Sequence, residues 1–254
     1  MANLNNTEMI DSYEEVLNEL SSKIGKKITI DQLFESGMNK IIRIDDYKIE
    51  EEWNKLKKKI EDKKGDVYVR SHGRNATGNK KLESLLEKVF GRKFKTDSTN
   101  NSKPKSLLKS CLGNEYQNYQ ISHIFEERTN NPFLFTAPWM VCYTPKIIDP
   151  FTGHESKGYP ELRKEFTQWA YNTNKEYINE YNDLIRPYWE KLKALFDKGQ
   201  DEYDEKFKER MIIALAPINL DYELRKPENK KNGYIYDFNK PTVDDILNES
   251  QINT

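Results

Sequence analysis

The chain has 254 residues, of which 36% are hydrophobic and 33% are charged, and its formal net charge at pH 7 is −1. This length accommodates one large domain or two small ones, and an aromatic content of 12% excludes a disordered chain. Two cysteines are too few for a disulfide framework, no run approaches 18 apolar residues, and the first 20 residues lack the apolar core of a signal peptide. We therefore expect a cytoplasmic protein with free thiols and no membrane partner.

The charge is distributed unevenly along the chain. Residues 54–110 carry 17 basic and 6 acidic side chains, a net charge of +11, whereas residues 1–53 and 111–254 each have a net charge of −6. A basic block of this size attracts a polyanion, and basic side chains on phosphates give salt-dependent binding. The alternative interpretation is that these lysines form ordinary solvated surface.

Residues 1–65 are predicted to be an N-terminal helical region. Apolar residues recur at helical spacing from Thr7 to Ser21, and a short helix is expected from Asp31 to Met38, broken near Gly37. A longer helix is expected from Asp45 or Asp46 to Lys63. Its apolar stripe consists of Ile49, Trp53, Leu56 and Ile60.

Residues 66–118 are predicted to form a basic loop and arm. Strand-forming residues end at Arg70, and a polar loop then leads into a helix from Lys80 to Phe90. Free N–H groups at a helix N-terminus and nearby polar side chains suit phosphate contact, although the loop can also be plain surface. The DNA contacts predicted here are Arg70, Arg74, Asn75 and Lys80. Residues 92–110 are interpreted as a basic arm or a linker, with a helix from Pro104 to Cys111.

Residues 119–158 contain the most informative stretch. Tyr119–Phe125 alternates apolar and polar residues as a short strand does, and it contains His123, one of only three histidines in the chain. A histidine can act as a general base at neutral pH, because its unperturbed pKa is about 6.5. The alternative is a histidine that is satisfied by a backbone carbonyl at a strand end.

The run Tyr119-Gln120-Ile121-Ser122-His123-Ile124 resembles the first strand of the HNH nucleases, also called ββα-metal or His-Me finger nucleases. The run from Thr129 to Trp139 is similar to loops of HNH-type restriction endonucleases. This resemblance implies that His123 is the general base and that His154 is a metal ligand. It also implies one divalent metal ion, for which we expect Mg²⁺.

The chain departs from the HNH pattern in two places. Ser122, which is predicted as a metal ligand together with His154, stands where many members have an aspartate that binds the metal, and the family asparagine aligns with Met140. Either Met140 replaces that catalytic residue and weakens or abolishes activity, or Asn131 or Asn130 takes its role. Arg128 is expected to hold a DNA phosphate, and the alternative is an ordinary surface arginine.

Residues 159–254 are predicted to be a C-terminal helical region. A long helix is expected from Pro160 through Tyr181 up to Pro187, a second from Tyr188 to Lys198 and a third from Glu202 to Leu215. A further helix start is expected at residues 242–245.

We therefore predict an α+β, mostly helical fold with a small ββα-metal nuclease motif embedded between helical regions. The predicted function is a metal-dependent DNA endonuclease, of the type II restriction class, and family analogy adds a homodimer acting on double-stranded DNA. The alternatives are a catalytically inactive nucleic-acid-binding protein of the same fold and an enzyme for a small phosphorylated substrate. Asp149 with Glu155-Ser156-Lys157 is only faintly similar to another endonuclease metal site, and the sequence lacks zinc-ribbon and P-loop patterns.

Overall fold

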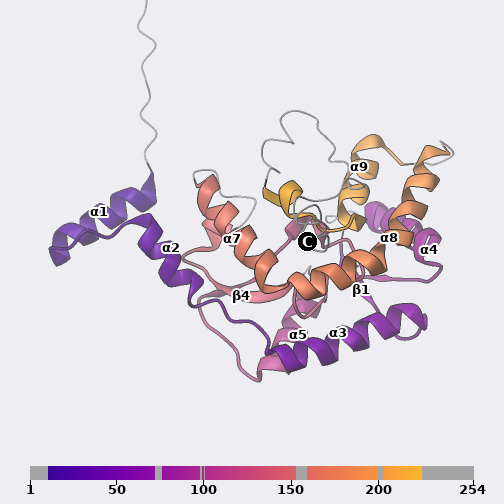
Figure 1. Ribbon diagram of the computed structural model, residues 1–254, viewed down its shortest axis with the longest axis horizontal. Coiled ribbons are helices and arrows are strands. Elements are labelled where there is room, and N and C mark those ends of the chain that lie inside the picture. The colour runs from indigo at the N-terminus through magenta and orange to yellow at the C-terminus, as the bar shows by residue number, and fades with distance from the viewer. Residues whose placement is uncertain are drawn as a thin grey trace, which may run out of the picture.

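The computed structural model in Figure 1 describes residues 11–71, 76–97, 99, 101–152, 159–198 and 203–224. These residues form a mostly helical α+β fold, which confirms the predicted class. The α-helices in this part of the chain are α1 (Ser12–Ile24), α2 (Ile30–Met38), α3 (Asp46–Glu61), α4 (Ala76–Phe90), α5 (Ser102–Leu112), α6 (Asp149–Thr152), α7 (Pro160–Thr173), α8 (Lys175–Asp197) and α9 (Glu205–Leu215). Among the described helices, none combines the length and apolar character needed to cross a bilayer.

Local side chains stabilise the start of α2 and the buried face of α3. Thr29 caps α2, and Gln32 completes a capping box with it, so that two backbone N–H groups at the helix start are satisfied. Gly37 is the next-to-last residue of α2, which ends at Met38 as predicted. The predicted stripe of α3 is confirmed, because all four of its apolar residues are buried: Ile49, Trp53, Leu56 and Ile60.

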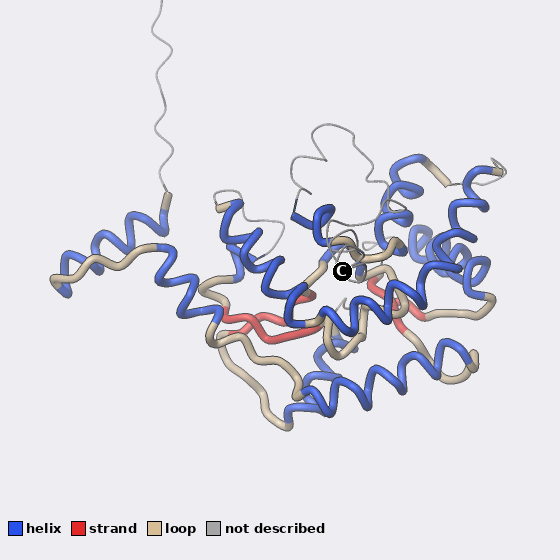
Figure 2. Tube along the Cα trace, in the orientation of Figure 1, coloured by secondary structure: helices blue, strands red, loops and turns tan. Residues whose placement is uncertain are grey.

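The described strands form two separate two-stranded sheets (Figure 2). Strands β1 (Tyr68–Arg70) and β2 (Lys95–Asp97) pair in parallel, and α4 connects them. Strands β3 (Tyr119–His123) and β4 (Val141–Pro145) pair antiparallel, with His123 opposite Val141. A β-hairpin is therefore present within residues 119–158.

The interpretation of residues 92–110 as an arm or linker is wrong for the part that forms β2. The backbone N–H of Lys95 donates to the carbonyl of Val67 at 3.0 Å, which starts the pairing with β1. Asp97, at the end of β2, is buried and accepts hydrogen bonds from the Ser102 hydroxyl at 2.7 Å and the Lys103 N–H at 2.8 Å. The segment is thus fixed between β1 and the start of α5.

The C-terminal helices break at a different place from the predicted one. Helix α7 ends at Thr173, and α8 continues through Pro187, so the prediction of a break at that proline is wrong. Asn174 lies at the observed break and is buried. Its Nδ2 donates to the Ala170 carbonyl at 2.8 Å, and its Oδ1 accepts from Nη2 of Arg43 at 3.0 Å. These contacts hold the junction between α7 and α8.

One hydrophobic core joins the four predicted regions. The ring of Phe133 lies 6.3 Å from that of Trp53, 6.1 Å from that of Phe90 and 6.1 Å from that of Tyr188, between ring centroids. These partners come from α3, α4 and α8, whereas Phe133 belongs to residues 124–140, the loop between β3 and β4. Aromatic side chains contribute large buried areas to a core. The loop that follows His123 therefore lies at the centre of the packing.

Candidate functional site at His123

His123 is the last residue of β3, and one residue of the following loop holds its imidazole. Nε2 of His123 lies 2.9 Å from the carbonyl oxygen of Phe135. The ring of Phe135 stacks on the imidazole, with 5.5 Å between the ring centroids and 10° between the planes. His123 is 7% exposed. Phe135 thus fixes both the position and the tilt of the ring.

The carbonyl partner determines the tautomer of His123. A carbonyl oxygen only accepts hydrogen bonds, so the neutral ring carries its proton on Nε2 and its lone pair on Nδ1. Within the described residues, Nδ1 has no hydrogen-bond partner. Burial lowers the pKa of His123 to about 4; the hydrogen bond to Phe135 opposes this change, and the positive charge of Arg70 adds to it. At pH 7 the ring is therefore neutral and able to accept a proton at Nδ1.

Asn131 shapes the turn that presents Phe135 to His123. The Asn131 carbonyl accepts hydrogen bonds from the N–H groups of Leu134 at 3.1 Å and Phe135 at 3.0 Å. Its side-chain Oδ1 accepts from the Phe133 N–H at 2.9 Å. These three bonds fix the backbone from which the Phe135 carbonyl reaches the imidazole.

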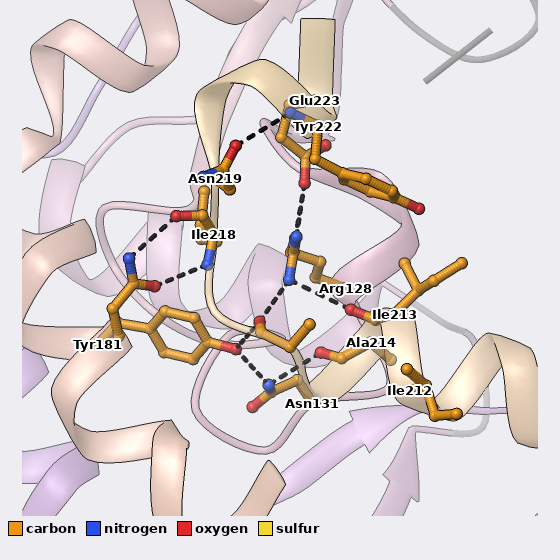
Figure 3. A network of polar contacts seen from close by, with 12 residues as sticks. Arg128, Asn131, Tyr181, Ile212, Ile213, Ala214, Ile218, Asn219, Tyr222 and Glu223 are labelled. Carbon is orange, nitrogen blue, oxygen red and sulfur yellow. Dashed lines mark hydrogen bonds and ion pairs between the residues drawn. The ribbon is translucent and has the colours of Figure 1, made fainter. Parts of the chain in front are cut away.

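The side-chain amide of Asn131 is fully committed to other groups. Its Nδ2 donates to the hydroxyl of Tyr181 at 2.8 Å and to the carbonyl of Ala214 at 2.9 Å, as Figure 3 shows. The residue is 0% exposed. This arrangement contradicts the alternative in which the Asn131 side chain takes the role of the family asparagine; Asn131 acts on the ring through the backbone of the turn.

The end of β1 lies against the same loop. The N–H of Arg70 donates to the carbonyl of Thr129 at 3.0 Å, and Nδ2 of Asn130 donates to the carbonyl of Arg70 at 2.7 Å. Asn130 is buried, and its Oδ1 has no hydrogen-bond partner among the described residues. The Arg70 segment and the His123 segment, which were predicted separately, are thus brought together.

The other predicted DNA contacts near Arg70 are only partly described. Lys80 is exposed on α4. Arg74 and Asn75 lie outside the described residues, as do His154 and the Glu155-Ser156-Lys157 run.

Arg128 has a structural role. It is 0% exposed, its Nε and Nη2 donate to Oε1 of Glu223 at 2.9 and 2.7 Å, and its Nη1 donates to the carbonyls of Ala216 and Ile213 (Figure 3). Although burial disfavours the charged form, the carboxylate of Glu223 raises the pKa of Arg128. The prediction that Arg128 holds a DNA phosphate is wrong, because the guanidinium is enclosed and already paired.

Met140 also has a structural role. It is 0% exposed and belongs to the hydrophobic core. Its carbonyl accepts a hydrogen bond from the Ile124 N–H at 3.0 Å, which closes the base of the loop next to the β3–β4 pair. A thioether is only a weak acceptor, so Met140 cannot supply the hydrogen bond that a catalytic asparagine would supply.

Ser122 precedes His123 on β3 and lies opposite Cys142 on β4. Successive side chains of a strand point to opposite faces, so Ser122 and His123 face opposite sides of the hairpin. A metal ion held by Ser122 would therefore lie on the other face from the imidazole. This geometry does not favour Ser122 as a ligand in the same site.

The next question is which described side chains could bind a divalent ion. Among those residues, no group of three or more His, Cys, Asp or Glu side chains is placed to hold a metal. Mg²⁺ prefers octahedral coordination by oxygen. Cys111 and Cys142 are buried free thiols, as expected, and burial raises the pKa of Cys142 to about 11. The predicted metal ligand His154 lies outside the described residues, and we assign no chemical step to a metal.

A further arginine, which was not predicted from the sequence, interacts electrostatically with Arg70. Arg210 lies on α9 with an exposed side chain. Although the residue as a whole is exposed, desolvation of its guanidinium and the positive charge of Arg70 lower the pKa of Arg210, and the charge of Glu127 opposes this change. Two guanidinium groups that interact in this way would both gain from an anion between them. Arg210 carries no sequence signal, because it is one basic residue on an amphipathic helix.

The fold and the site define an α+β protein in which a β-hairpin loop holds a buried, neutral histidine at a strand end. The chain belongs to the family whose model is described as "Uncharacterised protein PM1201", which matches residues 44–231. The uncharacterized protein PM1201 of Pasteurella multocida (strain Pm70) is 36% identical over 166 residues, which are 62% of this chain and 74% of that protein. No solved structure matches the chain. The matched range spans the positions of His123, Arg70 and Arg210.

Proposed function

We propose that this chain is a DNA endonuclease in which His123 takes a proton from the attacking water. The observation that carries the proposal is the tautomer of His123, in which the Phe135 carbonyl holds the Nε2 proton and leaves the Nδ1 lone pair available. Hydrolysis of a phosphodiester by in-line attack needs a base beside the nucleophile. A pKa of about 4 keeps His123 unprotonated at physiological pH, although it also makes the ring a weaker base.

The surroundings of His123 favour an anionic substrate. Arg70 is close enough for its charge to affect the imidazole, and Arg210 is close enough to Arg70 for their charges to interact. Guanidinium groups of this kind stabilise the charge that develops on a phosphate. The net charge of +11 in residues 54–110 favours a long polyanion over a small phosphorylated substrate.

The order of the elements supports the HNH resemblance. Strands β3 and β4 are followed by α6, which is a strand-strand-helix order. In the HNH class a divalent ion supplies charge stabilisation at the phosphate. We keep metal dependence and a type II restriction activity as parts of the proposal, while His123 and Arg70 are the described residues to which we assign roles.

The test is a cleavage assay with plasmid and phage DNA in Mg²⁺, in Mn²⁺ and in EDTA. We expect discrete fragments that require the metal and that disappear in His123→Gln and His123→Ala. Gln120→Ala is the matched control, because Gln120 is an exposed residue on the same strand. Circular dichroism melting curves verify that each variant is folded. Cleavage that survives in a folded His123→Gln protein would contradict the role of His123.

A second candidate function is a nucleic-acid-binding protein that has lost catalysis. Two observations favour it: Met140 is buried in the core, and Ser122 faces away from His123. This protein would retain DNA in a salt-sensitive manner and would not cleave it. Cleavage gained by Met140→Asn, and not by Met140→Leu, would show that the methionine is the cause of the lost activity.

A further inference from the structure

Helix α1 projects from the rest of the molecule (Figure 1). Its inner side is anchored by Leu17, which is 7% exposed, and by Tyr13, whose ring lies 5.0 Å from that of Phe151 between centroids. The family model begins at residue 44, so α1 precedes the matched region. The helix therefore lies outside the matched region, which includes the position of His123.

The side of α1 next to this anchor carries an exposed apolar stripe. Val16 is 55% exposed, Leu20 is 43% exposed and Ile24 is 57% exposed. Residues at intervals of four lie above one another along a helix, so the three side chains form one continuous line. Single exposed apolar residues are common on protein surfaces, but an aligned set on a projecting helix indicates a contact surface.

We propose that this stripe pairs with the same stripe of a second copy of the chain, with the two α1 helices antiparallel. A two-fold axis at Leu20 places Val16 of each copy against Ile24 of the other and Leu20 against Leu20. A two-fold interface uses the same patch on both subunits, so the patch must be complementary to itself. The line of three apolar residues centred on Leu20 meets this requirement.

The distribution of charge along α1 favours antiparallel pairing with a second copy. The acidic residues lie toward the N-terminal end, and the basic residues lie at and just beyond the C-terminal end: Asp11, Glu14, Glu15 and Glu19, followed by Lys23, Lys26 and Lys27. Antiparallel pairing puts the acidic end of one copy beside the basic end of the other, whereas parallel pairing puts like charges together.

One ion pair beside the stripe fits the same arrangement. Nζ of Lys23 lies 2.5 Å from Oε1 of Glu19 within one chain, and both side chains are 67% exposed. On a helix these two residues lie on the same flank of the apolar line. The two-fold axis brings Lys23 of each copy near Glu19 of the other. The ion pair within each chain can therefore be replaced by two equivalent ion pairs between the copies.

This inference does not depend on nuclease activity. It names the surface of a homodimer, whereas the proposed function concerns the chemistry at His123. A dimer without cleavage and cleavage by a monomer are both measurable, so the failure of one proposal is distinguishable from the failure of the other.

Sedimentation of the full chain over a concentration series tests the dimer. We expect a monomer–dimer equilibrium whose dissociation constant rises roughly tenfold or more in Leu20→Glu, because a central apolar contact is replaced by a buried charge. Asn18→Glu is the matched control, since it adds the same charge at an exposed position of α1 away from the stripe. It should dimerise like the original protein.

Charge exchange tests the orientation. Lys23→Glu alone should weaken the dimer, and adding Glu19→Lys should restore it. The proposal is overturned if the original chain remains a monomer at high concentration or if its dimer is unaffected by Leu20→Glu. A monomer that Leu20→Glu destabilises in thermal melting would also overturn it, because the stripe would then be covered within one chain.

Discussion

Arg128 and Glu223 form a salt bridge in which both side chains are withdrawn from solvent. Nη2 of Arg128 lies 2.7 Å from Oε1 of Glu223, and the two side chains are 0% and 3% exposed. Arg128 belongs to η1 (Glu126–Arg128) in the loop after His123, and Glu223 belongs to the helical residues 220–224. The pair therefore ties the described C-terminal segment to the loop that carries Phe135.

We predict that Glu223→Ala lowers the free energy of unfolding by about 3–5 kcal/mol, because it leaves the buried guanidinium without a counter-charge. Glu223→Gln should cost less, since its amide oxygen can still accept a hydrogen bond. Urea unfolding followed by circular dichroism measures both changes. Asp221→Ala is the control: this partly exposed acid lies two residues away, and its removal should change stability by about 0.5 kcal/mol or less.

A double replacement checks the mechanism of this loss. Arg128→Met combined with Glu223→Leu removes both charges and keeps apolar volume, so it should be less destabilising than Glu223→Ala. Equal losses in the two proteins would contradict the view that the unpaired charge, and not the lost contact, dominates.

The protonation of His123 gives a pH dependence with a definite sign. Its pKa is lowered from 6.5 to about 4 in the folded protein, so below pH 6.5 the unfolded chain binds a proton that the folded chain rejects. The free energy of unfolding should therefore fall as the pH falls from about 6.5 to about 4. At 1.36 kcal/mol per pH unit, the free energy of unfolding should be about 3 kcal/mol lower near pH 4 than near pH 6.5.

The comparison protein for this measurement is His123→Gln, which lacks the titrating group. Its stability should fall less over the same pH window, while carboxylates and the remaining histidines contribute equally to both proteins. Parallel curves for the two proteins between pH 7 and pH 4 would show that His123 titrates normally and would remove the physical basis for its neutral state.

The sequence predicts well those elements that depend on the spacing of residues close together in the chain. The stripe of α3 and the strand ending at His123 depend on spacing between near neighbours, and both are confirmed. Strand β2 was missed because Lys95-Thr96-Asp97 has no apolar alternation; its pairing with residues 68–70 determines it. Propensity also failed at Pro187, which α8 accommodates while Asn174 holds the break.

In the candidate site, too, local features could be predicted from the sequence and long-range contacts could not. A carbonyl partner for a strand-end histidine follows from general chemistry, but that Phe135 supplies it depends on turns that close only in three dimensions. The phosphate contact predicted for Arg128 was based only on its place in the polar loop after His123. Its partner Glu223 lies 95 residues further along the chain, and nothing near either residue shows that the two will be buried together.

We predict that Arg70→Ala and Arg210→Ala each weaken DNA binding similarly for all sequences. Each should reduce the slope of log affinity against log salt by about 1, because each removes one phosphate contact. Gel retention at several salt concentrations measures this slope. Arg163→Ala, a partly exposed arginine on α7, should leave it unchanged. An equal reduction in all three variants would indicate a diffuse basic surface without a phosphate site at Arg70.

Asn131 should influence cleavage without contacting DNA. In Asn131→Ala, the Phe133 N–H and the Ala214 carbonyl each lose a buried partner, and each unsatisfied group costs about 1–3 kcal/mol. The turn that carries Phe135 should loosen, so we expect a lower melting temperature and a kcat reduced by about tenfold or more at unchanged DNA affinity. Single-turnover cleavage and gel retention separate these effects. If kcat falls no further than in an equally destabilised Glu223→Gln protein, Asn131 serves stability alone and does not position His123.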